Sequence, residues 1–173
     1  MTARSRTSPP ADAPRRRRKN PKTLPDFHTA PGHLFRRGRQ LHDSLWLLHV
    51  DDTLTPLQYA VLTALELEPN IDQRTLGDRI ALDKSTVGDL IARLSNRGLI
   101  ERRSDDRDGR RRLLDITEEG REVLYRAAPG VAKIGELILG ALDEEERKEL
   151  MRLMDKIVYA ADAHAALSPV RVV

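Results

Sequence analysis

Apolar residues recur at helical spacing through most of this chain, most clearly in the stretch 83–98. Its apolar positions fall at i, i+3, i+4 and i+7, and they are Val87, Leu90, Ile91 and Leu94. The opposite face carries polar side chains, and these are Ser85, Thr86, Asp89, Arg93, Asn96 and Arg97. Asp83 is placed to cap the first turn and Gly98 to supply a left-handed stop. The pattern predicts one amphipathic helix.

The outer face of this helix is small near its N-terminus. Gly88 and Ala92 leave little bulk beside the polar side chains, so the helix can lie close to another surface. A recognition helix in the major groove of DNA needs this property, because its N-terminal side chains must reach base edges. An ordinary amphipathic surface helix is the alternative, and the neighbouring segments decide between the two.

A short helix and a tight turn precede this segment. Asp72 caps a predicted helix at 73–80, which turns Leu76 and Ile80 inward. Three residues, 81–83, join it to the next helix, and Gly77 allows the two helices to approach closely. A short helix, a tight turn and a longer helix with a polar outer face predict a helix-turn-helix.

After Gly98 the helical period ends. The segments 99–103 and 112–116 favour extended structure, and the loop between them is charged and turn-forming, which predicts a hairpin or wing. Residues 102–112 hold six arginines and three aspartates. The aspartates would hold guanidinium groups by bidentate pairing, so that an arginine at the tip projects into a minor groove. A solvated hairpin tip is the alternative.

Further helices flank this module. A predicted helix at 32–49 has an apolar stripe made by Leu34, Leu41, Leu45 and Leu48, widened by Trp46 and Leu47. Another begins at a capping box formed by Thr55 and Gln58, with Leu57, Val61, Leu62 and Leu65 expected inward. Two long helices follow Thr117, and the second starts at a capping box of Asp143 and Glu146. The terminal helices are too apolar to pack only on a small module, so we expect a homodimer that presents two reading helices to a pseudo-palindrome.

These elements divide the chain into five segments. We expect a disordered basic tail at 1–30, a first helix for dimerisation and a ligand pocket at 31–53, and a winged helix-turn-helix at 54–117. C-terminal dimerisation helices at 118–166 and a tail at 167–173 complete the chain. The predicted fold class is mainly α, with a small two- or three-stranded β wing.

Charge is distributed unevenly over the 173 residues. The net charge is +3, yet residues 1–30 hold eight basic and two acidic side chains, whereas the remainder holds 22 basic and 25 acidic ones. A mildly acidic body that binds nucleic acid must concentrate its positive charge locally, as the predicted wing does. The basic run at 15–19 is either an arm that touches phosphates or a solvated tail.

The composition of the chain and the motifs that it lacks argue against several other functions. The chain has no cysteine, and its five histidines form no metal-binding spacing with one another or with carboxylates. It has no glycine-rich phosphate loop and no GxSxG elbow, so we expect neither an enzyme nor a metal or cofactor. No apolar run approaches the ~20 residues that cross a bilayer, and the N-terminus lacks the apolar segment of a secretory signal. We therefore expect a cytoplasmic protein without a membrane partner; a winged-helix module that binds only proteins is disfavoured by the clustered arginines.

Three segments together resemble the MarR family of bacterial transcription regulators. They are LTPLQYAVLTAL at 54–65, LDKSTVGDLIARLSNRGLIERR at 82–103 and DDRDGRRRLLDITEEGREVL at 105–124. The resemblance extends over roughly residues 32–161, with flanking helices in the expected order. It implies a homodimer with a winged helix-turn-helix in each lobe, and repression that a small molecule relieves.

The resemblance also implies DNA-binding residues. Ser85, Thr86 and Arg93 would face double-stranded DNA from the helix, together with Lys84 and Asp89, and Arg107, Arg110 and Arg111 would do so from the wing. Two positions depart from many relatives, which carry Ser or Thr at Gly88 and a polar or basic residue at Asp89. A carboxylate accepts from cytosine N4 but is repelled by phosphate, so Asp89 is either a base reader or a brace for Arg93.

The opening PGHLFRRGRQLHDSLW at 31–46 resembles the subgroup that responds to aromatic acids and lies beside their degradation genes. There an arginine and a histidine of the first helix hold the carboxylate or the ring substituents. Arg36, His42 and Trp46, with His33 nearby, would offer a charge, a tunable donor and an apolar wall. The expected effector is an aromatic carboxylate or its aryl-CoA thioester, and the alternatives are another phenolic or toxic compound, or a surface or interface role for Arg36 and His42.

Overall fold

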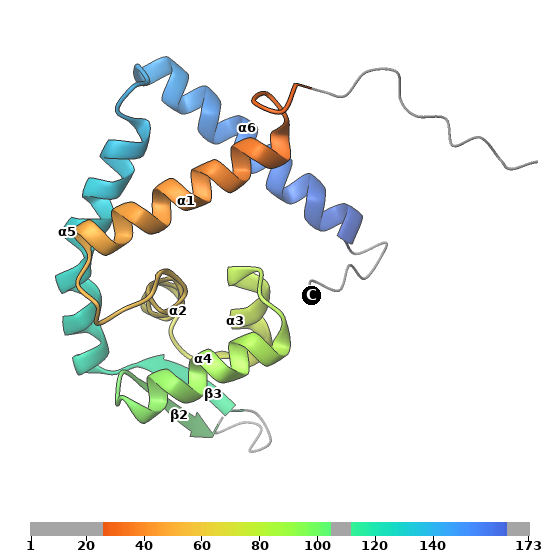
Figure 1. The fold of residues 1–173 in the computed structure, drawn as a ribbon. Coiled ribbons are helices and arrows are strands. Elements are labelled where there is room, and N and C mark those ends of the chain that lie inside the picture. Colours follow the sequence, from red (N-terminus) through yellow and green to blue (C-terminus); the bar gives the residue numbers. More distant parts are fainter. Residues whose placement is uncertain (1–25, 105–111, 166–173) are drawn as a thin grey trace, which may run out of the picture. The chain divides into compact units, whose positions relative to one another are not determined.

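The computed structural model describes residues 26–104 and 112–165, with side chains to residue 158. The chain divides into two units, residues 1–37 and 38–173, and each is described by itself. The elements are α1 (Pro31–His49), α2 (Pro56–Leu67), β1 (Ile71–Asp72), α3 (Gln73–Ile80), α4 (Lys84–Asn96), β2 (Ile100–Ser104), β3 (Arg112–Ile116), α5 (Glu118–Leu139) and α6 (Glu144–Ala165). Figure 1 labels the helices and the strands β2 and β3.

Side-chain caps fix where the helices begin, as the sequence predicts. At α2, the Thr55 hydroxyl oxygen accepts a hydrogen bond from the Gln58 backbone N–H, and the Gln58 side-chain oxygen accepts one from the Thr55 backbone N–H. Pro56 occupies the first helical position. The reciprocal pair of Asp143 and Glu146 opens α6 in the same way, with distances of 3.0 and 2.9 Å. These caps satisfy N–H groups that a helix start leaves without a partner.

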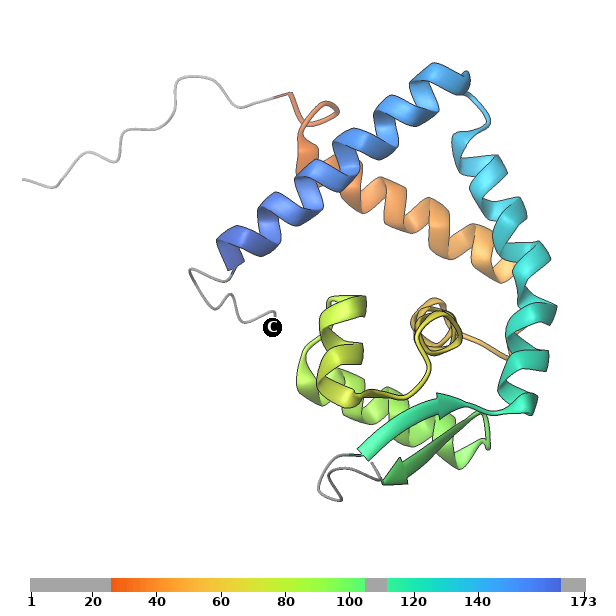
Figure 2. The ribbon, with the colours of Figure 1, turned by 180° about the vertical axis from the view of Figure 1, so that it is seen from behind.

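The sheet has three antiparallel strands in the order β1-β3-β2. Figure 2 shows the pair of β2 and β3 from behind. Leu114 of β3 pairs with Ile71 on one side and with Arg102 on the other. The predicted hairpin of β2 and β3 is confirmed, and the two-residue β1 completes the sheet of a winged helix. The strand β1 also leads directly into α3, so the sheet fixes where the helix-turn-helix begins.

The core of the second unit is aliphatic, with Trp46 as its one aromatic member among the described residues. It gathers buried side chains from α2, α3, α4, the sheet and α5, and the largest fully buried ones are Leu62, Leu65, Leu76, Ile91, Leu94, Leu99, Leu114, Val61 and Val87. The indole N–H of Trp46 donates to the Leu54 carbonyl at 2.9 Å, so its polar atom is satisfied inside the core. The four apolar residues predicted on the inner face of α4 are all buried in this core, which confirms that prediction.

Several helices keep apolar side chains on the surface. The stripe expected on α1 is largely exposed, because only Trp46 of that helix is buried and Leu47 is 83% exposed. On α6 the exposed apolar side chains are Met151, Leu153, Ile157 and Val158. Leu57 of α2, expected inward, is also exposed, and the side chain of Gln58 is buried instead because it closes the capping box. In the described parts of the chain, no helix is both long enough and apolar enough to cross a membrane.

Candidate nucleic-acid interface

The turn between α3 and α4 is held by backbone geometry. Ala81 adopts the left-handed conformation at φ 51°, which ends α3, and the Leu82 N–H donates to the Gly77 carbonyl at 3.1 Å. A Cβ atom on Gly77 would lie 3.2 Å from the Leu82 carbonyl oxygen and 3.4 Å from a methyl group of Val87. The small residue predicted at this junction is therefore needed for the close approach of the two helices.

Asp83 organises the start of α4. Its Oδ1 accepts from the backbone N–H groups of Ser85 and Thr86, at 2.9 and 3.1 Å. The two hydroxyl groups donate to the same carboxylate, Ser85 at 2.7 Å and Thr86 at 2.6 Å. Hydrogen bonds from the Thr86 hydroxyl first, then from the Ser85 hydroxyl, hold the pKa of Asp83 far below its usual range. The carboxylate thus fixes the orientation of both hydroxyls.

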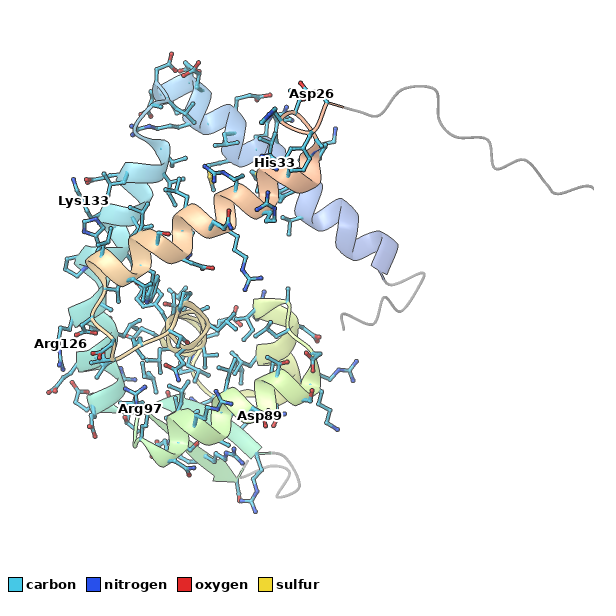
Figure 3. All side chains as sticks on the ribbon, in the orientation of Figure 1. Asp26, His33, Asp89, Arg97, Arg126 and Lys133 are labelled. Carbon is cyan, nitrogen blue, oxygen red and sulfur yellow. The ribbon has the colours of Figure 1, made fainter. Side chains whose placement is uncertain are left out.

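The outer face of α4 is exposed. Lys84, Ser85, Asp89 and Arg93 are exposed and Thr86 is half-buried, so all five helix residues predicted to contact DNA are accessible. Within the residues that the structure describes, the charged groups of Lys84, Asp89 and Arg93 have no ion-pair partner. Figure 3 shows the Asp89 side chain on α4, with Arg97 at the end of the same helix. Charged groups without internal partners are available to a ligand.

Gln73 joins the two helices of the motif and was not predicted. Its side-chain amide donates to the Lys84 carbonyl at 3.2 Å, and a Cβ on Gly88 would lie 3.3 Å from the same amide nitrogen. Gly88 therefore leaves room for the Gln73 side chain along one side of α4. The pairing joins residues 11 apart in the sequence, which periodicity does not reveal.

A network of charges braces the base of the wing. The Arg103 guanidinium of β2 pairs with Asp115 of β3, lies 3.2 Å from a Glu101 carboxylate oxygen and donates to the Asn70 side chain at 3.2 Å. Asp115 is nearly buried, and its other oxygen accepts from the Ile116 N–H at 2.9 Å. The Arg103 guanidinium is therefore occupied by contacts that hold β2 and β3 together.

The same network continues into α5 and α2. Arg121 lies 4.0 Å from Asp115 and donates to Glu66 at 2.9 Å, while the Tyr125 hydroxyl donates to Glu66 at 2.6 Å. The hydrogen bond from Tyr125 and then the one from Arg121 lower the pKa of Glu66. Partners up to 59 positions apart form this network, so sequence spacing gave no signal of it.

The wing-tip residues Arg107, Arg110 and Arg111 lie outside the described residues, so their predicted contacts stay predictions. At the ends of the two strands, Arg112 donates to the Ser104 hydroxyl at 2.6 Å. Arg102 is exposed and has no ion-pair partner among the described residues.

The residues predicted to bind a ligand fall in both units. In the first unit, the Arg36 guanidinium lies 3.0 Å from His33 Nδ1, and the His33 ring packs on Phe27 with ring centroids 4.2 Å apart. In the second unit, the His42 ring lies 5.8 Å from the Trp46 ring, and His42 Nδ1 is 3.6 Å from an Asp43 oxygen. In the described parts of the chain, no three His, Asp or Glu side chains converge as a metal site would require.

An open groove of about 430 Å³ lies between α2 and α3, in the second unit. Tyr59 and Ile80 are among the residues that line it, and an ion pair of Arg79 with Glu68, at 2.7 Å, lies beside them. Thr63 also lines the groove, and its buried hydroxyl oxygen has no hydrogen-bond partner among the described residues. Tyr59 packs edge-on against Trp46 with centroids 5.8 Å apart, so one ring of the groove wall contacts the Trp46 side chain.

Together, the helix-turn-helix and the strand hairpin define a winged helix-turn-helix protein. The MarR family model matches residues 52–111. The transcriptional regulator HosA of Escherichia coli O111:H- is 37% identical over 128 residues, which cover 74% of this chain and 94% of HosA. The chain belongs to the MarR family of transcriptional regulators.

Solved structures agree with this assignment. The PcaV transcriptional regulator from Streptomyces coelicolor, in complex with its natural ligand, is 41% identical with a TM-score of 0.76, covering 80% of this chain and 99% of PcaV. BpsR of Bordetella bronchiseptica, whose DNA binding is regulated by 6-hydroxynicotinic acid, is 30% identical with a TM-score of 0.68, covering 73% of this chain and 97% of BpsR. Both relatives are regulators, and both are described with a small molecule.

Proposed function

We propose that this chain is a ligand-responsive repressor that binds a pseudo-palindromic DNA operator as a homodimer. The observation that carries the proposal is the outer face of α4, where exposed polar side chains stand on a helix with a small residue at Ala92. Lys84 and Arg93 are available to DNA because neither has an ion-pair partner among the described residues. Such a face fits the major groove, where short side chains near a helix N-terminus meet base edges.

The exposed apolar side chains of the terminal helices support a dimer. Leu47 and Leu48 of α1 are largely exposed, as are Met151 and Ile157 of α6. Exposed apolar area of this kind marks an interaction surface, and a second copy of the chain would remove it from water. A two-fold pair would carry two copies of α4 to two half-sites of one operator.

An aromatic carboxylic acid or its CoA thioester is the proposed effector, acting on a repressor of catabolic genes. The groove lined by Tyr59 offers an aromatic wall and the Thr63 hydroxyl, which has no hydrogen-bond partner among the described residues. The Arg79 guanidinium, paired with Glu68, lies at its edge. Its volume, about 430 Å³, suits a single-ring acid. The His42 ring, 5.8 Å from the Trp46 ring, supplies a further hydrogen-bonding group near this aromatic wall. The regulation of BpsR by 6-hydroxynicotinic acid, a hydroxylated pyridine acid, supports this class of effector, and PcaV likewise binds a natural ligand.

Binding to a duplex selected from a random library tests the proposal. The full-length chain should enrich a palindromic sequence, and its affinity should fall steeply as salt rises from 50 to 200 mM, because phosphate contacts release counterions. Benzoic, hydroxybenzoic and hydroxynicotinic acids and their CoA thioesters are then added to the complex. Release by an aromatic acid supports the effector class, whereas release only by unrelated phenols would overturn it. Failure to enrich any duplex would overturn the DNA-binding proposal itself.

The effector groove has its own matched variants. Thr63→Val removes the buried hydroxyl at nearly constant volume and should weaken the response to the acid without weakening DNA binding. Thr53→Val changes a threonine outside the groove and should leave the response unchanged. An equal response to the acid in the natural protein and in both variants would show that the effector binds elsewhere.

A further inference from the structure

We infer that Asp89 determines operator specificity by accepting a hydrogen bond from the N4 amino group of one cytosine in each half-site. The inference rests on the proposed DNA-binding function and names the base that α4 reads. Sequence left two roles open for Asp89, a base reader and a brace for Arg93. The structure separates them, because the two side chains form no ion pair although they are one turn apart on the helix.

Asp89 lies at the centre of the outer face of α4. The fully buried residues Val87 and Ile91 stand two positions before and after it. At about 100° per residue, two positions place Asp89 about 160° around the helix from each of them. A helix seated on this core therefore points Asp89 straight outward. In a recognition helix that direction leads to the floor of the major groove, while positions further round meet its phosphate walls.

The immediate neighbours of Asp89 on this face allow close approach. Ser85, one turn before Asp89, has a hydroxyl whose proton is given to Asp83 at 2.7 Å. Ala92, three positions after it, is exposed and carries only a methyl group. The Ser85 hydroxyl therefore offers lone pairs to DNA and Ala92 adds little bulk. The face thus accepts hydrogen bonds at Asp89 and on its N-terminal side, while the donors of Arg93 lie one turn after it. A surface of acceptors requires a donor from its ligand.

Cytosine is the base that meets this requirement. Its major-groove edge offers the N4 amino donor with no acceptor beside it on the same base. Adenine offers an amino group next to the N7 acceptor, and guanine and thymine offer acceptors, which a carboxylate repels. A carboxylate also cannot face phosphate favourably, whereas Arg93 and Arg97, about 40° and 80° further round the helix, can. The negative charge at the centre of the face thus suits a base amino group, and the positive charges to one side suit phosphates.

The test uses the full-length protein and the duplex that it selects from a random library. Each cytosine of that duplex is replaced in turn by N4-methylcytosine, which keeps its pair with guanine but puts a methyl group where the major-groove proton was. One replacement in each half-site should weaken binding of the natural protein by about fivefold or more. Asp89→Ala should bind the methylated and unmethylated duplexes equally, and selection with this variant should no longer fix cytosine at that position.

A matched variant separates base reading from simple charge. Glu122→Ala on α5 removes one exposed carboxylate that has no ion-pair partner among the described residues, and it should keep full sensitivity to methylation. If no N4-methylcytosine weakens the natural protein, or if Asp89→Ala keeps the same sensitive cytosine, the inference is wrong. If the natural protein selects no duplex at all, the proposed DNA-binding function is wrong. That result differs from the two outcomes that contradict only the role of Asp89.

Discussion

The hydroxyl of Thr86 donates to Oδ2 of Asp83 at 2.6 Å, across the first turn of α4. This contact couples folding to recognition, because the carboxylate that starts the helix also sets the hydroxyl that would face DNA. With the proton of Thr86 engaged, only its lone pairs are available to a base or to water. The cap therefore decides which partners the first turn of α4 can accept.

Removing the cap should destabilise the protein in a pH-dependent way. The pKa of Asp83 is lower in the folded chain than in the unfolded one, so its contribution to stability is present above the usual aspartate pKa, about 3.9. As the pH falls below that value, the contribution is lost. We expect Asp83→Ala to lower the Tm by about 2–6 °C at pH 7 and by progressively less below pH 4. Thermal unfolding followed by circular dichroism measures this difference.

Asp78→Ala is the control for that prediction, because Asp78 is exposed on α3 and makes no hydrogen bond or ion pair with a described residue. It should leave the Tm nearly unchanged at pH 7. An Asp83→Ala protein as stable as the natural one at pH 7 would contradict the capping role.

Two glycines of α5 should respond oppositely to alanine. A Cβ on Gly120 would lie 2.1 Å from the Leu99 carbonyl oxygen, so the start of α5 could no longer pack against the strands. Gly120→Ala should lower the free energy of unfolding by about 1–3 kcal/mol. A Cβ on Gly135 meets nothing within 4 Å, so Gly135→Ala should be neutral or stabilising by up to about 1 kcal/mol. Urea unfolding compares them, and equal effects would be evidence against this packing.

The brace of the wing depends on Asp115 more than on Glu101, although both contact Arg103. Asp115 is nearly buried and also accepts from a backbone N–H, whereas Glu101 is half exposed. Asp115→Ala should therefore lower the free energy of unfolding by about 1–3 kcal/mol, because it leaves the buried N–H of Ile116 without its acceptor. Glu101→Ala should cost less than about 1 kcal/mol. Chemical denaturation measures both, and a larger loss for Glu101→Ala would show that the network is organised differently.

A charge placed on α6 should break the proposed dimer. Ile157 is 49% exposed, and a carboxylate there would be buried without a partner if a second chain covers the helix. Ile157→Glu should sediment as a monomer in analytical ultracentrifugation at concentrations where the natural protein is a dimer. Leu67→Glu changes a still more exposed leucine on α2 and should remain dimeric. Monomeric natural protein would refute the dimer, and dissociation of the Leu67 variant alone would place its interface elsewhere.

Much of the fold could be predicted from local signals in the sequence. The spacing of Val87, Leu90, Ile91 and Leu94 fixed the inner face of α4, and the caps at Asp72, Asp83 and Thr55 fixed three helix starts. These features depend on residues within one or two turns of each other, which periodicity and capping rules describe. The polar side chains expected on the outer face of α4 are accessible for the same reason, since helical spacing alone places them opposite the apolar face.

What sequence missed depends on contacts between distant residues. The strand β1, the Gln73 link to α4 and the network from Arg103 to Glu66 each join positions well separated along the chain. Leu57 was expected inward because it is apolar, but the reciprocal cap at Thr55 turned Gln58 inward in its place. Tertiary packing decided each of these cases, and rules based on neighbouring residues cannot predict such packing.

The central claim is that the outer face of α4 enters a DNA groove, and blocking that face tests it most directly. Ala92→Trp adds a large ring at an exposed position near the middle of the face, and Glu122→Trp adds the same ring on α5. Fluorescence anisotropy with the selected duplex should show that Ala92→Trp binds at least about a hundredfold more weakly at an unchanged Tm, while Glu122→Trp binds like the natural protein. Equal affinity of the Ala92 variant and the natural protein would contradict the account.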